Sequence, residues 1–160
     1  MPRSTGRQRA AGKPARRKPA TRARVLARLR AICLALPEAQ ERLSHGEPTW
    51  FAGKGKVFAM LDDHHHGAEH ISVWLPAGLG AQEALVDSDP RRYFRPPYVG
   101  HRGWLGVRLD VDPDWEEMAA ICVEAYRQVA PKKLVAQLDA AQLDGSNDGS
   151  NDDPNDDTAR

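Results

Sequence analysis

A chain of 160 residues is long enough for one domain with a hydrophobic core but not comfortably for two. No stretch approaches the roughly 18 apolar residues of a membrane span, and the first residues lack the apolar segment of a secretory signal, so we expect a cytoplasmic protein. The formal net charge of +1 conceals an asymmetry, because residues 1–30 are rich in Arg and Lys without a single acid, whereas the last residues are rich in Asp.

Both ends of the chain are predicted to be disordered. Residues 1–20 combine Arg and Lys with Pro, Gly and Ala in no apolar period, so they cannot bury enough surface to offset the entropy lost on ordering. This basic arm either contacts nucleic-acid phosphates or only keeps the chain soluble. Residues 144–160 repeat Gly, Ser, Asn and Asp and form an acidic tail. One folded domain is therefore expected at residues 21–143.

The first expected element is an amphipathic helix over residues 21–36, because apolar side chains recur there at i, i+3 or i+4, and i+7. A turn at residues 44–48 then leads into a β-hairpin, whose two apolar runs are separated by Gly53-Lys54-Gly55-Lys56. The turn of this hairpin displays Lys54 and Lys56. It is too short to be a P-loop, but it resembles a wing that reaches a phosphate backbone.

Residues 62–70 contain four histidines and three acids in what we expect to be a loop before the next strand, residues 71–75. A metal site is one hypothesis, and adventitious binding of nickel or zinc is the other. Because no spaced ligand pattern such as HExxH is present, we predict no metal site here. Cys33 and Cys122 both fall on apolar stripes of expected helices and are predicted to be core residues.

The most specific stretch is residues 89–110, which combines four aromatic residues with Arg91, Arg92, Arg95, Arg102 and Arg108. A short helix at residues 81–88 precedes it. Pro96 and Pro97 hold the chain extended, and Gly100 and Gly103 permit positive φ. We therefore predict a stiff turn that presents cationic side chains.

From Trp104 to Asp110 the sequence alternates strictly, which predicts a half-buried strand with Trp104 and Arg108 on the less apolar side. Trp74 takes the corresponding side of the strand at residues 71–75. An exposed arginine and indole could grip a phosphate and stack on a base. The commoner alternative is that a loop covers Trp104 and that Arg108 pairs with a carboxylate.

The end of the domain is predicted to be helical. Asp112 is the expected cap, Pro113 the first helical residue, and apolar side chains continue the stripe as far as Val129. A shorter helix around Leu134 and Leu138 is expected to close the fold.

Four motifs in this order resemble the MmcQ/YjbR family: HGEPTWF at 45–51, GKVFA at 55–59, PYVG at 97–100 followed by Gly103-Trp104, and VAPKKL at 129–134. The resemblance spans about residues 24–138. It implies a frataxin-like (CyaY-like) α+β fold, a two-layer sandwich in which an antiparallel sheet has helices packed on one face. It also implies a DNA-binding protein with a double-wing arrangement.

The leading hypothesis is a non-enzymatic DNA-binding domain without a cofactor, of undetermined oligomeric state. Trp104 would stack or pack, and the predicted phosphate contacts are Lys54, Lys56, Arg91, Arg92, Arg95, Arg102 and Arg108. The alternative is a small-molecule or protein ligand on the open sheet face, near Trp74, Trp104 and Tyr98. Metal handling by analogy with frataxin ranks last, because the first helix is basic here.

No catalytic residues are predicted. Ser44, His45 and Glu47 share one tight turn, where neighbouring side chains rarely converge, and no nucleophile elbow accompanies them. His101 is expected to be a surface histidine.

Overall fold

The computed structural model describes residues 22–65 and 69–146. The predicted basic arm, three residues of the histidine-rich loop and most of the predicted acidic tail lie outside the described residues. The elements in chain order are α1 (Arg22–Leu34), β1 (Ala39–Ser44), β2 (Glu47–Ala52), β3 (Val57–Asp63), β4 (Ile71–Pro76), α2 (Leu79–Ser88), β5 (Tyr93–Phe94), the 3-10 helix η1 (Gly100–Arg102), β6 (Trp104–Arg108), α3 (Trp115–Val129) and α4 (Lys132–Ser146).

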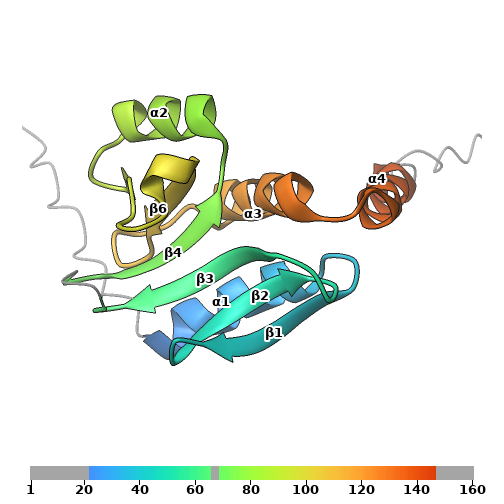
Figure 1. Ribbon diagram of the computed structural model, residues 1–160, viewed down its shortest axis with the longest axis horizontal. Coiled ribbons are helices and arrows are strands. Elements are labelled where there is room, and N and C mark those ends of the chain that lie inside the picture. Colours follow the sequence, from blue (N-terminus) through green and yellow to red (C-terminus); the bar gives the residue numbers. More distant parts are fainter. Residues whose placement is uncertain (1–21, 66–68, 147–160) are drawn as a thin grey trace, which may run out of the picture.

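The described strands form one antiparallel sheet in the order β1-β2-β3-β4-β6-β5. Helices α1 and α3 lie on one face of the sheet (Figure 1). We call the opposite face, which these two helices do not cover, the open face. This arrangement confirms the predicted α+β class with helices on one side. No described helix has the length and apolar character needed to cross a membrane.

A two-residue turn joins β1 to β2. His45 and Gly46 both have positive φ, 53° and 80°, as a type I′ turn requires, and this turn matches the twist of the flanking strands. Strand β1 was not predicted. Its residues AQERLS lie at the edge of the sheet, none of them is buried, and they show no clear alternation of apolar and polar residues.

The core lies between the sheet and the two helices. Trp50 on β2 is fully buried, and the ring of Phe58 meets that of Tyr126 on α3 edge to face at 5.3 Å. The Tyr126 hydroxyl donates a 2.6 Å hydrogen bond to the carbonyl of Pro37, which ties α3 to the segment after α1. Cys33 and Cys122 are both buried in this cluster, as predicted.

Two helix boundaries differ from the prediction. Helix α3 begins after Asp114, whose carboxylate accepts hydrogen bonds from the amides of Glu116 and Glu117 at 3.0 and 3.1 Å, so this residue and not Asp112 is the cap. Helix α4 continues to Ser146 and therefore passes the predicted domain boundary at residue 143.

The segment before β6 is a compact turn, as predicted, but its backbone differs. Gly103 has positive φ, 83°, whereas the second residue in that conformation is Tyr98, at 66°, and not Gly100. Gly100 serves a different need, because an added Cβ there would lie 3.3 Å from Cβ of Arg95. The side chain of Gln82 on α2 donates to the carbonyls of Gly100 and Trp104 and so fixes this turn against β6.

The short edge strand β5 packs its second residue onto the open face. Phe94 pairs with Gly106 of β6, and its ring occupies the space above that glycine. A Cβ added at Gly106 would lie 2.3 Å from Cζ of Phe94. Glycine at position 106 therefore allows the aromatic ring to cover the sheet.

We predict that Gly106→Ala lowers the free energy of unfolding by about 1–3 kcal/mol, because the new methyl group displaces the ring of Phe94. Urea denaturation measures the change. The matched control is Gly80→Ala on α2, where nothing lies within 4 Å of the added Cβ and the change should stabilise the helix by about 0.5–1 kcal/mol. Equal effects of the two substitutions would show that Phe94 does not occupy this position in solution.

Candidate nucleic-acid interface

The open face carries a row of neighbouring, mostly apolar residues that runs across five strands. Strand register places Thr49 of β2 beside Met60 of β3, Met60 beside Trp74 of β4, and Trp74 beside Gly106 of β6, which Phe94 covers. Alternation along the strands puts these residues opposite the helix layer. The open face is therefore largely apolar at its centre.

Trp74 and Trp104 share the open face, as predicted, but they differ in exposure. Trp74 is only 3 % exposed, and its indole N–H donates a 3.1 Å hydrogen bond to the hydroxyl of Ser72. Trp104, the first residue of β6, is half-buried. Of the two indoles, only that of Trp104 is available to a ligand.

A second planar group on this face was not predicted. Arg42 on β1 extends its guanidinium over the ring of Phe51 on β2, with its central carbon 3.7 Å from the ring centroid. Arg42 is exposed, and Phe51 is half-buried. The sequence contains both residues, but the contact follows from the pairing of β1 with β2, and β1 itself was missed.

Two of the predicted phosphate contacts are held by carboxylates. Arg108 forms two hydrogen bonds to Asp110, at 3.1 and 2.9 Å, and the carboxylate raises the arginine's pKa. Arg92 donates to Glu117 of α3 at 3.1 Å and therefore lies on the helix side of the sheet. Arg92 therefore lies away from the other predicted phosphate contacts, and Arg108 has the carboxylate partner that the alternative interpretation expected.

Arg91 and Arg95 form looser ion pairs. The guanidinium of Arg91 lies 3.7 Å from Asp89, and that of Arg95 lies 3.5 Å from Glu83 of α2. Both arginine side chains are more than half exposed, so these contacts are screened by water and contribute little to stability.

The remaining predicted cations lie at one end of the sheet, together with two lysines that the sequence analysis did not single out. The β2–β3 turn, the last residue of β4 and the first residue of β6 meet at this end. The turn also touches the first turn of α4, because a Cβ added at Gly53 would lie 3.4 Å from Cδ1 of Leu134. We define the cationic end as Lys54, Lys56, Arg102, Lys132 and Lys133.

All five side chains of the cationic end are exposed, and within residues 22–65 and 69–146 none of them forms an ion pair. Lys132 and Lys133, which were not predicted as contacts, follow Pro131 and belong to the fourth family motif. Their position beside the β2–β3 turn could not be seen without the packing of α4.

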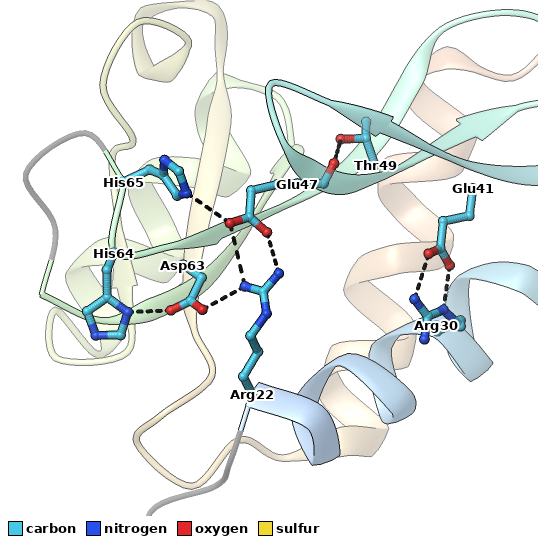
Figure 2. A network of polar contacts seen from close by, with 8 residues as sticks. All are labelled: Arg22, Arg30, Glu41, Glu47, Thr49, Asp63, His64 and His65. Carbon is cyan, nitrogen blue, oxygen red and sulfur yellow. Dashed lines mark hydrogen bonds and ion pairs between the residues drawn. The ribbon is translucent and has the colours of Figure 1, made fainter.

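The opposite end of the sheet is closed by a polar network (Figure 2). Arg22 at the start of α1 donates to Glu47 at 2.8 Å and to Asp63 at 2.6 Å. His64 contacts Asp63, and the ring of His65 lies 3.0 Å from Glu47. Here a cation of the basic first helix joins the β1–β2 turn to the end of β3, so it serves the fold.

Arg30 makes a similar bond from the middle of α1. Its guanidinium donates twice to Glu41 of β1 at 2.7 Å, and the indole of Trp50 donates to the same carboxylate at 3.2 Å (Figure 2 shows the arginine and the glutamate). The hydrogen bonds from Arg30 lower the pKa of Glu41. Two arginines of α1 are thus committed to carboxylates of the sheet.

The described residues bring together neither a metal cluster nor a catalytic set. No group of three or more His, Cys, Asp or Glu side chains within residues 22–65 and 69–146 is placed to hold a metal ion. The hydroxyl of Ser44 lies 3.1 Å from Nδ1 of His45 on the exposed β1–β2 turn, while Glu47 is directed toward Arg22 and does not orient the imidazole. His101 is exposed in η1, as expected for a surface histidine.

Comparisons with known proteins match this architecture. The model of the YjbR family matches residues 34–128. The crystal structure of protein DR2400 of Deinococcus radiodurans, described as a DUF419 domain, superimposes with a TM-score of 0.52 at 18% sequence identity, over 61% of this chain and 72% of that one. No curated protein matches the chain.

The half-buried His70 on the open face predicts a pH-dependent stability of the domain. The imidazole of His70 packs edge to face on Phe94 at 5.1 Å, and its Nε2 is buried without a hydrogen bond to any described residue. Burial lowers its pKa, and the charge of Arg108 lowers it further, against the opposing charges of Asp110 and Asp62.

We predict that the free energy of unfolding falls as the pH drops below about 6.5, because the unfolded imidazole takes up a proton there while the folded one resists it. His70→Gln removes this titration and should flatten the dependence between pH 7.5 and 5.5. Urea denaturation of both proteins at the two pH values measures the difference, and the other histidines cancel in the comparison. Parallel pH profiles would mean that His70 is not protected from protonation.

Proposed function

The chain belongs to the YjbR family, and we propose that its domain is a non-enzymatic, cytoplasmic nucleic-acid-binding module that uses the cationic end and the adjoining part of the open face. The proposal rests on one observation: some of the predicted cations are paired with carboxylates, whereas others form no ion pair. Arg92 and Arg108 are each paired with a carboxylate, whereas the five cations at the cationic end form no ion pair in the described part of the chain.

Exposed cations without an ion pair favour an anionic partner. An ammonium or guanidinium group that is not held in an ion pair can bind a phosphate without first breaking that contact. Half-buried Trp104 and the Arg42–Phe51 stack lie on the neighbouring surface and offer flat groups to bases. Phosphate contacts and stacking groups thus adjoin each other.

The set of contacts is smaller than the sequence suggested. We retain DNA as the partner, with Lys54, Lys56, Arg102 and Trp104 as primary contacts. Arg91 and Arg95 remain peripheral contacts, because their ion pairs are loose. Arg92 and Arg108 are removed, since each would have to give up a carboxylate partner.

In this proposal the two wings implied by the family resemblance are the β2–β3 turn with its lysines and the segment 95–103 with Arg102. Both contact the phosphate backbone, and neither reads the bases.

A second candidate function is binding of a flat small molecule on the open face. The Arg42–Phe51 stack and Trp104 favour it, because both present planar groups on one surface. Trp74 is not part of this candidate site, because it is almost fully buried. Quenching of tryptophan fluorescence by a small aromatic compound, absent in Trp104→Phe, would favour this function over the first.

We predict that the affinity for a DNA oligonucleotide falls steeply as salt rises, because each neutralised phosphate releases counterions. Fluorescence anisotropy across a salt series gives the slope of log K against log salt. Lys54→Ala, Lys56→Ala and Arg102→Ala should each reduce that slope by about 0.7–0.9, the contribution of one phosphate.

The matched control is Arg24→Ala, which removes the same charge from the exposed surface of α1 on the other side of the molecule. It should leave the slope nearly unchanged. A chain without residues 1–20 is measured in parallel, which separates any binding by the basic arm from binding by the folded domain. If deletion of the arm alone abolishes binding and the three substitutions change nothing, the cationic end is not the site.

A further inference from the structure

Two flat groups face outward from the same end of the open face. The first is the guanidinium of Arg42, whose central carbon lies over the ring of Phe51, 3.7 Å from its centroid, and which has no carboxylate partner among the described residues. A guanidinium held over an aromatic ring presents its other face to solvent, where a base can stack on it. The ring of Phe51 thus fixes Arg42 in a conformation suited to stacking.

The second flat group is the indole of Trp104. Strand order places β3 and β4 between β2 and β6, so Phe51 and Trp104 are separated by three strand spacings, about 14 Å. Both lie near the ends of their strands that meet the cationic end. Lys54 and Lys56 follow Phe51 by three and five residues, and Arg102 precedes Trp104 by two.

Each stacking group is therefore accompanied by an unpaired cation. This repeated combination matches the repeating chemistry of a nucleotide strand, in which each base is linked to a phosphate. The surface between the two groups contains the buried Pro76 and the half-buried Val57, and it adds no carboxylate to that path.

We infer that the ligand of this face is a single-stranded nucleic acid, with one base stacked on Arg42 and another on Trp104 and with its phosphates on Lys54, Lys56 and Arg102. This inference rests on the proposed function. It goes further because it specifies which form of nucleic acid binds.

A duplex does not expose the faces of its bases to stacking groups on a protein. In double-stranded DNA the faces of the bases are covered by neighbouring bases, and only their edges are accessible in the grooves. Stacking groups on a broad sheet cannot reach those covered faces, whereas a single strand exposes them. A duplex could use the cations but would leave both flat groups unused.

The experiment is an anisotropy titration of the full chain with a labelled single strand of about 12 nucleotides and with the duplex of the same sequence. We expect the single strand to bind at least about tenfold more tightly. DNA and RNA versions of the strand are both measured, since stacking on a planar group does not distinguish them.

Two substitutions test the stacking groups. Arg42→Ala and Trp104→Ala should each weaken single-strand binding about tenfold and leave duplex binding unchanged, the loss typical of one stacked base. Trp104→Phe retains an aromatic ring and should largely restore the affinity, and it also serves if Trp104→Ala does not fold. Arg24→Ala is again the control for a lost charge. Arg42→Lys keeps the charge without the plane and should behave like Arg42→Ala.

The outcomes separate this inference from the proposed function. Equal affinity for the single strand and the duplex, with no effect of the substitutions at positions 42 and 104, overturns the single-strand inference and leaves nucleic-acid binding intact. If neither form binds at low salt, the proposed function fails and this inference fails with it. Single-strand binding that is lost in Lys54→Ala and Lys56→Ala but not in Trp104→Ala overturns the stacking arrangement.

Discussion

Strands β2, β3, β4 and β6 bury side chains against the helix layer, and this burial determines which side chains the other face can display. Trp50 and the partners of Tyr126 occupy the covered side and hold the two layers together. The residues between them in the sequence necessarily point the other way. Arg42, Phe51 and Trp104 are on the open face for that reason, and a one-residue slip of register would exchange the two sets.

The distribution of carboxylates decides which cations remain available. Within the arginine-rich passage before and within β6, Arg91, Arg92 and Arg108 are paired with Asp89, Glu117 and Asp110, and Arg95 is paired with Glu83. Such pairs at a surface contribute little to stability, but each one places a negative charge next to the cation and weakens its attraction for phosphate. Arg102 of this passage forms no ion pair with a described residue. The lysines of the β2–β3 turn and of the start of α4 form no ion pair within the described residues, although the carboxylate of Glu38 lies beside Gly53 of that turn. The abundance of arginine in a stretch of sequence was thus a poor guide to the charge that a ligand meets.

The sequence predicted most elements whose signal is local. Alternation identified β6, the glycine-rich turn identified the β2–β3 hairpin, and the Asp-Pro pair identified α3, although it placed the helix cap at Asp112, two residues before the observed cap Asp114. Two strands escaped detection for physical reasons: β5 is too short to show a period, and β1 is a largely exposed edge with little apolar patterning.

The candidate site was predicted only in part, because its contacts join residues that are distant along the chain. The pairing of Arg92 with Glu117 depends on how α3 packs, and no pattern in the sequence encodes it. Arg108 and Asp110 are different, since two residues of a strand at i and i+2 share a face and their pairing was foreseeable. Arg42 was missed with β1, and Lys132 with Lys133 needed the packing of α4 on the β2–β3 turn.

The Arg22 network also determines where the chain enters the folded domain. Its bonds to Glu47 and Asp63 hold the beginning of α1 at the end of the sheet that lies farthest from Lys54 and Lys56. Strands of six residues make these two ends about 20 Å apart. A polyanion that touches both the attachment point of the N-terminal residues and the lysine-bearing turn must therefore span the whole length of the strands. The length of the strands therefore sets the shortest polyanion that can touch both places.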